Sequence, residues 1–388
     1  MFKIIKKSKK SNARLGAIKT KHGSIKTPCF FPDATRASVR GLTTDDLKRL
    51  GLQAMIVNTY HLYLQPGIAR IKKAKGAHEF MNWRGPLASD SGGYQVFSLV
   101  HRNKNNGKIT DKGVVFKSVY DGSSHLLTPK KSIQLQFDLG VDLMVCFDDV
   151  PPHDIGVSGM QESIKHTIAW AKICKKEFDV QVKKHDLSKN PPILFGVIQG
   201  GMEKQLREQC AKALLEIGFD GYGFGARPVD AEGNFMSDIL DYTARLIPDD
   251  KIRFNLGMGL PNDIIRAVEM GWDLFDCVIP TREARHGRLY FENGFGNGRR
   301  PFLEVADRFR ISFKYQAKSI TNAKFANDHT PVNPNSKLPE LREYSKAYLH
   351  HLFKSKEPLC IRLATLNNLE FYLDLMTRIR GAIKAGRL

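Results

Sequence analysis

Short apolar runs alternate with amphipathic, helix-like segments along most of residues 52–280. The run VDLMVCFDD at 141–149 predicts a buried strand. The segment TPKKSIQLQFDLG before it predicts a helix that begins after Thr128 and ends at Gly140. Similar strand–helix pairs follow further along the chain. This alternation is typical of an α/β protein whose parallel sheet is covered by helices.

Two parallel architectures fit this pattern, an open doubly wound sheet and a closed (β/α)8 TIM barrel. Polar side chains follow the ends of four apolar runs, namely Asp90, Asp148, Gln199 and Asp276. In a barrel the carboxyl ends of all strands meet at one rim, where active sites lie, whereas an open sheet spreads them along an edge. The number of strand–helix units and the position of these four residues predict the barrel.

Both ends of the chain depart from the alternating pattern. The segment ARLGAIKTKHGSIKTPCFFP at 13–32 predicts two short strands around a glycine turn, which form an N-terminal β cap. The chain after residue 290 predicts an irregular or β-rich insertion, followed by a helical appendage from about Leu338. We therefore expect a catalytic barrel with N-terminal strands at 1–290 and a C-terminal helical subdomain at 291–388, packed on the barrel.

The chain carries a large excess of positive charge. Its 60 lysine and arginine residues outnumber its 40 aspartate and glutamate residues, which gives a formal net charge of +20. This charge favours a polyanionic partner, of which nucleic acid is the commonest; the alternative is a solvated, lysine-rich surface. A membrane span needs about 18 or more consecutive apolar residues, and the sequence contains no such stretch, so we expect no membrane partner.

The six cysteines occur singly, without a CxxC or CxC pair. This spacing is typical of free thiols in a reducing compartment, and the cytoplasm is the simplest location. The spacing also gives no local metal-binding signature, and His286, His350 and His351 lack the neighbouring ligands that a metal site needs. We therefore expect no metal ion, and we interpret these histidines as surface or packing residues.

The aspartates at the strand ends are suited to breaking a glycosidic bond. One carboxylate attacks or stabilises the anomeric carbon and a second moves the proton, and the candidates are Asp276, Asp90 and Asp148. The alternative for any single aspartate is the capping of the next helix. Cys277 is an alternative nucleophile, but strand alternation places it on the face opposite Asp276, which predicts a packing role for the thiol.

Six segments together carry a family resemblance, in the order ASDSGGYQVFSL, FKSVYDGSSHLLTP, LFGVIQGGM, GFDGYGFG, NLGMGLPNDI and FDCVIPTREARHG. They resemble the signature segments of bacterial tRNA-guanine transglycosylases, also called queuine tRNA-ribosyltransferases. The resemblance implies a (β/α)8 barrel that exchanges guanine at the anticodon wobble position of tRNA for a 7-deazaguanine base, in queuosine biosynthesis. It also implies tRNA and either 7-aminomethyl-7-deazaguanine or queuine as partners.

The resemblance implies a role for each matching residue. Asp276 resembles the nucleophile that attacks ribose C1′ and forms a covalent intermediate, and Asp90 resembles the general acid/base. The residues that match the substrate pocket are Ser91, Gly92, Gly93, Tyr94, Asp148, Gln199, Gly225, Ala226 and Leu256. The residues that match the RNA-contacting loops are Gly257, Met258, Gly259, Leu260, Pro261, Asn262, Asp263, Thr281, Arg282, Glu283, Ala284 and Arg285.

The chain departs from the family pattern near its C-terminus and in the pocket. The positions of the family's zinc ligands, CxCxxC plus a distant histidine, are occupied by Ser336, Leu338, Leu341 and Asn367. None of these is a thiolate or an imidazole, so we expect no zinc. Whether the chain forms the family's usual homodimer is left open by the sequence. Val150 and the segment 226–228 also differ from the bacterial pattern. These differences make salvaged queuine a candidate for the incoming base.

A non-catalytic tRNA-binding paralogue, or a partner subunit of such an enzyme, is the alternative function. It would explain the replaced zinc ligands. The joint presence of Asp90, Asp148, Gln199 and Asp276 favours the enzyme, because loss of activity usually removes the nucleophile. The sequence therefore predicts a pentosyltransferase acting on tRNA.

Overall fold

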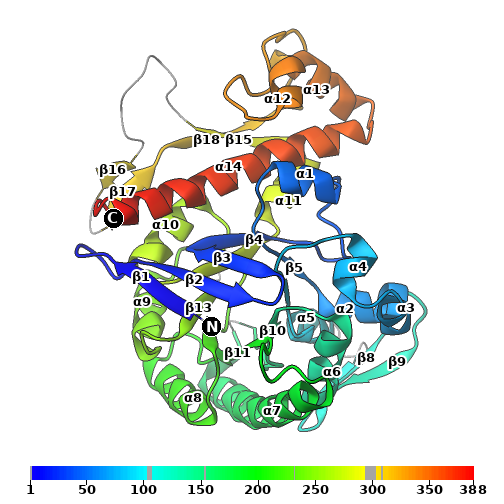
Figure 1. The fold of residues 1–388 in the computed structure, drawn as a ribbon, viewed down its shortest axis with the longest axis vertical. Helices are drawn as coiled ribbons and strands as arrows, with labels where there is room; N and C mark the ends of the chain where they lie inside the picture. Colours follow the sequence, from blue (N-terminus) through cyan, green and yellow to red (C-terminus); the bar gives the residue numbers. More distant parts are fainter. Residues whose placement is uncertain (1, 103–106, 153, 231, 293–302, 307–308) are drawn as a thin grey trace.

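A parallel barrel lies at the centre of the computed structural model, which describes residues 2–102, 107–152, 154–230, 232–292, 303–306 and 309–388. Eight strands form one parallel sheet, and Figure 1 shows helices wrapped around it. In spatial order they are β4 (Cys29–Pro32), β14 (Leu274–Cys277), β13 (Ile252–Asn255), β12 (Gly221–Phe224), β11 (Ile193–Ile198), β10 (Leu143–Val145), β6 (Leu87–Ser89) and β5 (Met55–Val57). A parallel bridge between Asp33 and Ile56 joins β4 back to β5. The predicted (β/α)8 TIM barrel is confirmed.

The helices around the barrel begin and end at residues that favour helix termini. In α6 (Pro129–Leu139), the Thr128 hydroxyl accepts a hydrogen bond from the Lys131 N–H, and Gly140 ends the helix with a φ of 70°. The other helices that lie between barrel strands include α5 (Gly93–Arg102), α7 (Gly156–Lys184), α8 (Lys204–Ile217), α9 (Ser237–Leu246) and α10 (Pro261–Glu269). The short α11 (Ile279–Arg285) follows β14.

The predicted N-terminal β cap is a three-stranded antiparallel sheet of β1 (Phe2–Lys7), β2 (Arg14–Thr20) and β3 (Gly23–Thr27). Ile18 and Ile25 of the cap share an apolar cluster with Phe195 of the barrel interior. In the turn between β2 and β3, His22 Nδ1 lies 2.9 Å from Oδ1 of Asp142, the residue before β10. The cap therefore covers the amino ends of the strands, and the predicted functional residues lie at the opposite end.

The sequence pattern does not predict two insertions in the barrel. Between β5 and β6 the chain forms α2 (Thr59–Leu62), a kinked turn (Tyr63–Gly67), α3 (Ile68–Lys73) and α4 (Ala77–Met81). Between α5 and α6 it forms an antiparallel sheet of β7 (Gly107–Thr110), β8 (Gly113–Lys117) and β9 (Ser124–Leu127). These elements are too short for a clear hydrophobic period, which explains why they were missed.

The C-terminal part of the chain packs on the barrel. β15 (Arg288–Glu292) pairs with β18 (Tyr315–Ser319), and β16 (Leu303–Ala306) pairs with β17 (Phe309–Phe313); residues 293–302 and 307–308 of the predicted insertion lie outside the described residues. After α12 (Pro339–Glu343) and α13 (Lys346–Lys354), the long α14 (Leu359–Lys384) runs across the molecule next to α11 (Figure 1). The Tyr372 O–H of α14 donates to the Gly259 carbonyl at 2.5 Å, which links this helix to the rim.

All six cysteines are buried and free. Within the part of the chain that the structure describes, no helix combines the length and the apolar character needed to cross a membrane.

Candidate active site

The strand-end residues meet at one rim of the barrel. The Gln199 Nε2, just after β11, donates to Asp148 Oδ2 at 2.8 Å. The negative charges of Asp276 and Asp148 both raise the pKa of Asp90, which requires the three carboxylates to lie near one another. These four residues thus bring three acids and one amide to the rim from four different strands.

Asp276 is the third residue of β14 and lies at the rim. Leu274, two residues earlier, packs in the barrel interior, whereas Cys277 packs in the outer layer between strands and helices. The Gly257 N–H donates to Asp276 Oδ1 at 3.1 Å. Burial raises the pKa of Asp276 to about 7, the hydrogen bond from Gly257 offsets part of this rise, and the charge of Asp33 adds to it.

Cys277 is not suited to act as a nucleophile. Burial raises the pKa of its thiol to about 12, so the reactive thiolate is scarce at neutral pH. Its side chain is packed between strands and helices, which confirms the packing role predicted from strand alternation.

Asp90 is held by three hydrogen-bond donors immediately after β6. The Asn58 Nδ2 donates to Oδ2, and the backbone N–H groups of Thr59 and Gly92 donate to Oδ1 at 2.9 and 3.1 Å. Burial nevertheless raises the pKa of Asp90 to about 7, and the neighbouring acids add to the rise. A carboxyl group with a pKa near neutrality is suited to exchange a proton.

Gly92 meets a steric requirement beside Asp90. Its φ is 78°, and a Cβ at this position would lie 3.1 Å from the Tyr60 nitrogen, so only glycine fits without adjustment. Ser91 and Gly93 are buried, whereas Tyr94 at the start of α5 is 52% exposed. An exposed aromatic ring next to a buried glycine turn offers a surface on which a base can stack.

Asp148, Gln199 and Gly225 follow the neighbouring strands β10, β11 and β12. Burial raises the pKa of Asp148 to about 7, the hydrogen bond from Gln199 lowers it, and the charge of Asp149 raises it. A Cβ on Gly225 would lie 2.5 Å from the Gln199 side chain, so the close approach of β12 requires glycine. Ala226, next to it, has a φ of 150°, a backbone conformation that favours glycine.

Four residues that support the site were not predicted from the sequence. The buried Arg207 of α8 donates to the carbonyls of Ile198 and Gly225, which fixes the backbone on either side of Gln199 in the sheet. Asn58 and Thr59 act through Asp90, so their own sequence pattern gives no signal. Asp33 does carry a signal: it follows the apolar run CFFP as the other rim acids follow theirs.

The two predicted RNA-contacting segments flank Asp276 in sequence and in space. Leu256 and Gly257 follow β13, and Thr281–Arg285 lies in α11. The exposed members are Gly257, Leu260 and Arg282; the half-buried members are Asn262, Glu283 and Arg285. The side chains of Met258, Pro261, Asp263, Thr281 and Ala284 are buried and Gly259 is buried as well. The buried members face the protein, so only the others are accessible to a partner.

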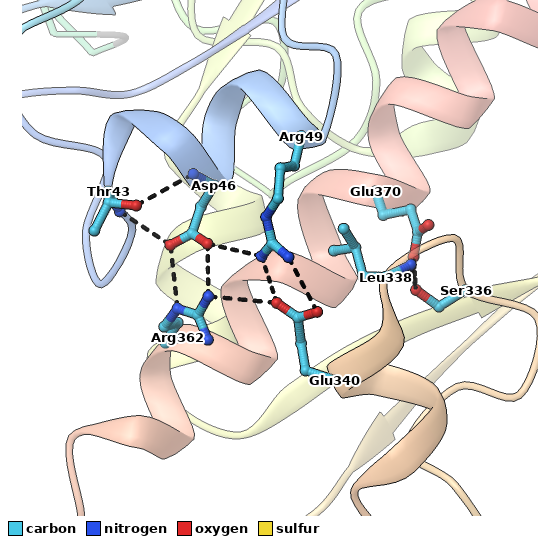
Figure 2. A network of polar contacts seen from close by, with 8 residues as sticks. All are labelled: Thr43, Asp46, Arg49, Ser336, Leu338, Glu340, Arg362 and Glu370. Atoms are coloured by element: carbon cyan, nitrogen blue, oxygen red, sulfur yellow. Dashed lines mark hydrogen bonds and ion pairs between the residues drawn. The ribbon is translucent and has the colours of Figure 1, made fainter.

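The residues that we expect at the positions of the family's zinc ligands lie in a hydrogen-bonded C-terminal cap between α12 and α14. The Ser336 Oγ donates to Glu370 Oε2 at 2.5 Å, and the Lys337 N–H donates to Glu370 Oε1 at 2.6 Å. The Asn367 Nδ2 donates to the Tyr290 carbonyl at 3.0 Å. Leu338 and Leu341 are buried in the main core. Figure 2 shows the Ser336–Glu370 contact beside Leu338.

A second network in Figure 2 joins α12 and α14 of the C-terminal cap to the helix α1 beside the barrel. Asp46 of α1 (Thr44–Arg49) accepts hydrogen bonds from Arg362 Nη2 at 2.6 Å and from Arg49 Nη2 at 2.9 Å. Both arginines also contact Glu340 of α12. Burial tends to raise the pKa of Asp46, but the hydrogen bonds, that from Arg362 first, outweigh it and lower the pKa to about 2.

Comparisons with known proteins connect this chain to one protein family. The family model described as queuine tRNA-ribosyltransferase matches residues 8–388. Relatives of that name from Halothermothrix orenii and Thermoanaerobacter pseudethanolicus are each 40% identical over 387 residues, which covers 100% of this chain and 94% of each relative. A relative of the same name from Staphylococcus aureus (strain bovine RF122) is 41% identical over 387 residues, and the match covers 93% of that relative. The chain therefore belongs to the queuine tRNA-ribosyltransferase family.

Proposed function

We propose that this chain exchanges guanine at the wobble position of tRNA for a 7-deazaguanine base through a covalent intermediate between Asp276 and ribose. Its family membership makes it a tRNA-guanine transglycosylase, a pentosyltransferase of queuosine modification. The proposed mechanism rests above all on one observation. The separate carboxylates of Asp276 and Asp90 lie at one rim, and the hydrogen-bonded pair of Asp148 and Gln199 lies beside them.

The reaction is a double displacement at C1′. The Asp276 carboxylate attacks C1′ as the C1′–N9 bond breaks, and the departing guanine takes a proton at N9 from Asp90. The incoming base returns its N9 proton to Asp90 as N9 attacks C1′ and the bond to Asp276 breaks. Two displacements retain the configuration at C1′. Each group thus ends as it began, Asp276 ionised and Asp90 protonated.

The pocket beside these acids is suited to a guanine-like base. Such a base presents N–H donors on one edge and a carbonyl oxygen next to them. The Asp148 carboxylate accepts from N–H groups, and the Gln199 amide donates as well as accepts, so this pair can satisfy that edge. Tyr94 and Leu256 supply the two faces between which the base stacks. The base must leave its own stack in the anticodon loop to enter this pocket.

We further propose that queuine, rather than 7-aminomethyl-7-deazaguanine, is the incoming base. Val150 and Ala226 differ from the bacterial pattern at the pocket rim, which supports queuine over 7-aminomethyl-7-deazaguanine. A competition assay with both free bases and one tRNA decides the point. Preference for queuine supports this assignment, and clear preference for the aminomethyl base contradicts it.

We also propose that the C-terminal cap holds its shape without zinc. Serine, leucine, leucine and asparagine supply no thiolate and no imidazole, so this donor set does not fit the family's tetrahedral site. The hydrogen bonds from Ser336 and Lys337 to Glu370 support the same turn instead. We place the protein in the cytoplasm with its tRNA substrate. Light scattering, which measures the mass of the protein in solution, tests whether it forms a homodimer.

Exchange of labelled guanine into tRNA tests the proposed function. The wild-type protein should incorporate label, and Asp276→Asn should not. Asp186→Asn is the matched control, because Asp186 lies exposed after α7, with a φ of 52° that asparagine tolerates. Wild-type protein that binds tRNA but incorporates no label would support the non-catalytic paralogue.

A further inference from the structure

Asp33 lies at the rim beside the proposed nucleophile, on the strand to which no role has yet been given. Phe31 of β4 is paired in register with Asp276 of β14 and packs in the barrel interior. Because side chains alternate along a strand, Asp33 lies on the same face as Phe31, two residues closer to the rim. Its bridge to Ile56 places it between β14 and β5.

The contacts of Asp33 occupy one carboxylate oxygen and leave the other weakly bound. The buried Thr281 donates its hydroxyl to Oδ1 at 2.5 Å. The Thr35 hydroxyl lies 3.4 Å from Oδ2, at the long limit for a hydrogen bond. Asp33 itself is half-buried, so part of its surface is open to solvent. Among the described residues, the structure therefore holds an oriented acceptor whose second oxygen is available to a donor.

The arrangement of the rim indicates which part of the substrate Asp33 faces. The base-binding candidates lie on β6, β10, β11, β12 and β13, and Asp276 on β14 reacts with the sugar. On the other side of Asp276 comes β4, so Asp33 borders the sugar on the side away from the base. A carboxylate repels phosphate and needs a hydrogen-bond donor.

Only one group of the sugar meets that requirement. Within an RNA chain the 3′ and 5′ oxygens of a ribose are esterified to phosphate, so the 2′-hydroxyl is the only donor that the sugar carries. That hydroxyl is bonded to C2′, next to the carbon that Asp276 attacks. Hydrogen bonds to the 2-hydroxyl of a sugar strengthen in the transition state of retaining glycosyl transfer.

We propose that Asp33 Oδ2 accepts a hydrogen bond from the 2′-hydroxyl of the nucleotide that Asp276 attacks, and so selects RNA over DNA at this position. The inference rests on the proposed function, because it assumes that Asp276 reacts with a nucleotide sugar. Burial raises the pKa of Asp33 and the nearby Arg285 offsets part of this rise, so this arginine supports the ionised acceptor. The competing interpretation is that Asp33 only positions Thr281 and α11.

The test compares two anticodon stem–loops that differ only at the exchanged guanosine, one with ribose and one with 2′-deoxyribose. The kcat/KM for guanine exchange is measured for wild type, Asp33→Asn, Asp33→Ala and the control Asp186→Asn. A hydrogen bond to a charged acceptor predicts a wild-type preference for ribose of about 10- to 100-fold. The preference should shrink in Asp33→Asn, which keeps a weaker acceptor, and vanish in Asp33→Ala, while Asp186→Asn retains it.

A purely structural role gives a different result. If Asp33→Ala lowers kcat/KM by the same factor on both stem–loops, or if wild type does not distinguish them, the proposal is overturned. Dissociation constants for both stem–loops give the same comparison without exchange. Binding without exchange by wild type would contradict the proposed function, and the ratio of the two dissociation constants would still decide the role of Asp33.

Discussion

The Gln199 side-chain amide donates to Asp148 Oδ2 over 2.8 Å and joins the ends of two neighbouring barrel strands. The hydrogen bond fixes the direction of the carboxylate and lowers its pKa against the effect of burial. The side chains thus form one preorganised polar edge, to which we propose that a base binds, because neither can turn without breaking the bond.

Replacement of Gln199 by alanine should therefore weaken base binding. Asp148 loses the partner that orients it, and its pKa rises further, so it accepts N–H donors less well. We expect the KM for the free base to rise about tenfold, the scale of one hydrogen bond to a charged group. The dissociation constant for tRNA serves as the control and should stay unchanged. An unaltered KM for the base would contradict this role.

The rate should depend on pH through a narrow bell near pH 7. Asp276 must be ionised to attack, and its pKa is raised to about 7, so kcat/KM falls as the pH drops below that value. Asp90 must be protonated, and its pKa is also about 7, so the rate falls again at higher pH. The pKa values read from the two limbs of this curve belong to the coupled pair of Asp276 and Asp90 rather than to either residue alone. A flat profile between pH 6 and 8, with folding intact, would contradict the assignment.

Ala226→Gly should stabilise the protein. The backbone at this position has a φ of 150°, where an alanine Cβ is strained and glycine is not. Relief of that strain should raise the free energy of unfolding by about 1 kcal/mol, less the entropy that glycine gains in the unfolded chain. Urea denaturation measures the change, and Ala226→Val should shift it in the opposite direction. A lower stability for the glycine variant would argue against the strain.

The C-terminal cap should be insensitive to chelators. We propose that its stability comes from the ion network around Asp46 and Glu340 rather than from a metal. EDTA should then leave the melting temperature unchanged. Glu340→Gln removes the negative partner of Arg49 and Arg362 and should cost about 1 kcal/mol, because both arginines are partly exposed. Purified protein that holds one equivalent of tightly bound zinc would refute the metal-free cap.

The part of the site that follows from barrel geometry could be predicted from the sequence. Asp90, Asp148, Gln199 and Asp276 each follow an apolar run, and closure of the barrel brings such positions together whatever the loops do. The opposite packing of Asp276 and Cys277 followed from strand alternation in the same way. The alternation of strands and helices therefore predicted the barrel, and the residues at the strand ends predicted its rim.

The remainder depends on contacts between distant segments, which periodicity does not encode. Asp33 ends a strand that looked like part of the N-terminal cap, and its place beside Asp276 appears only when β4 closes the barrel. Asn58 matters because it holds Asp90, a contact across 32 positions of the chain. The burial of Thr281 was equally unforeseen, because the short α11 packs on α14.

The covalent intermediate provides the most direct test of the account. Wild-type protein, Asp276→Asn and Asp186→Asn are each mixed with tRNA, quenched under denaturing conditions and examined by gel and by intact mass. The account predicts an adduct with the mass of protein plus tRNA minus guanine for wild type and Asp186→Asn, bonded through Asp276, and none for Asp276→Asn. Base exchange without an adduct, or an undiminished adduct in Asp276→Asn, would contradict Asp276 as the nucleophile.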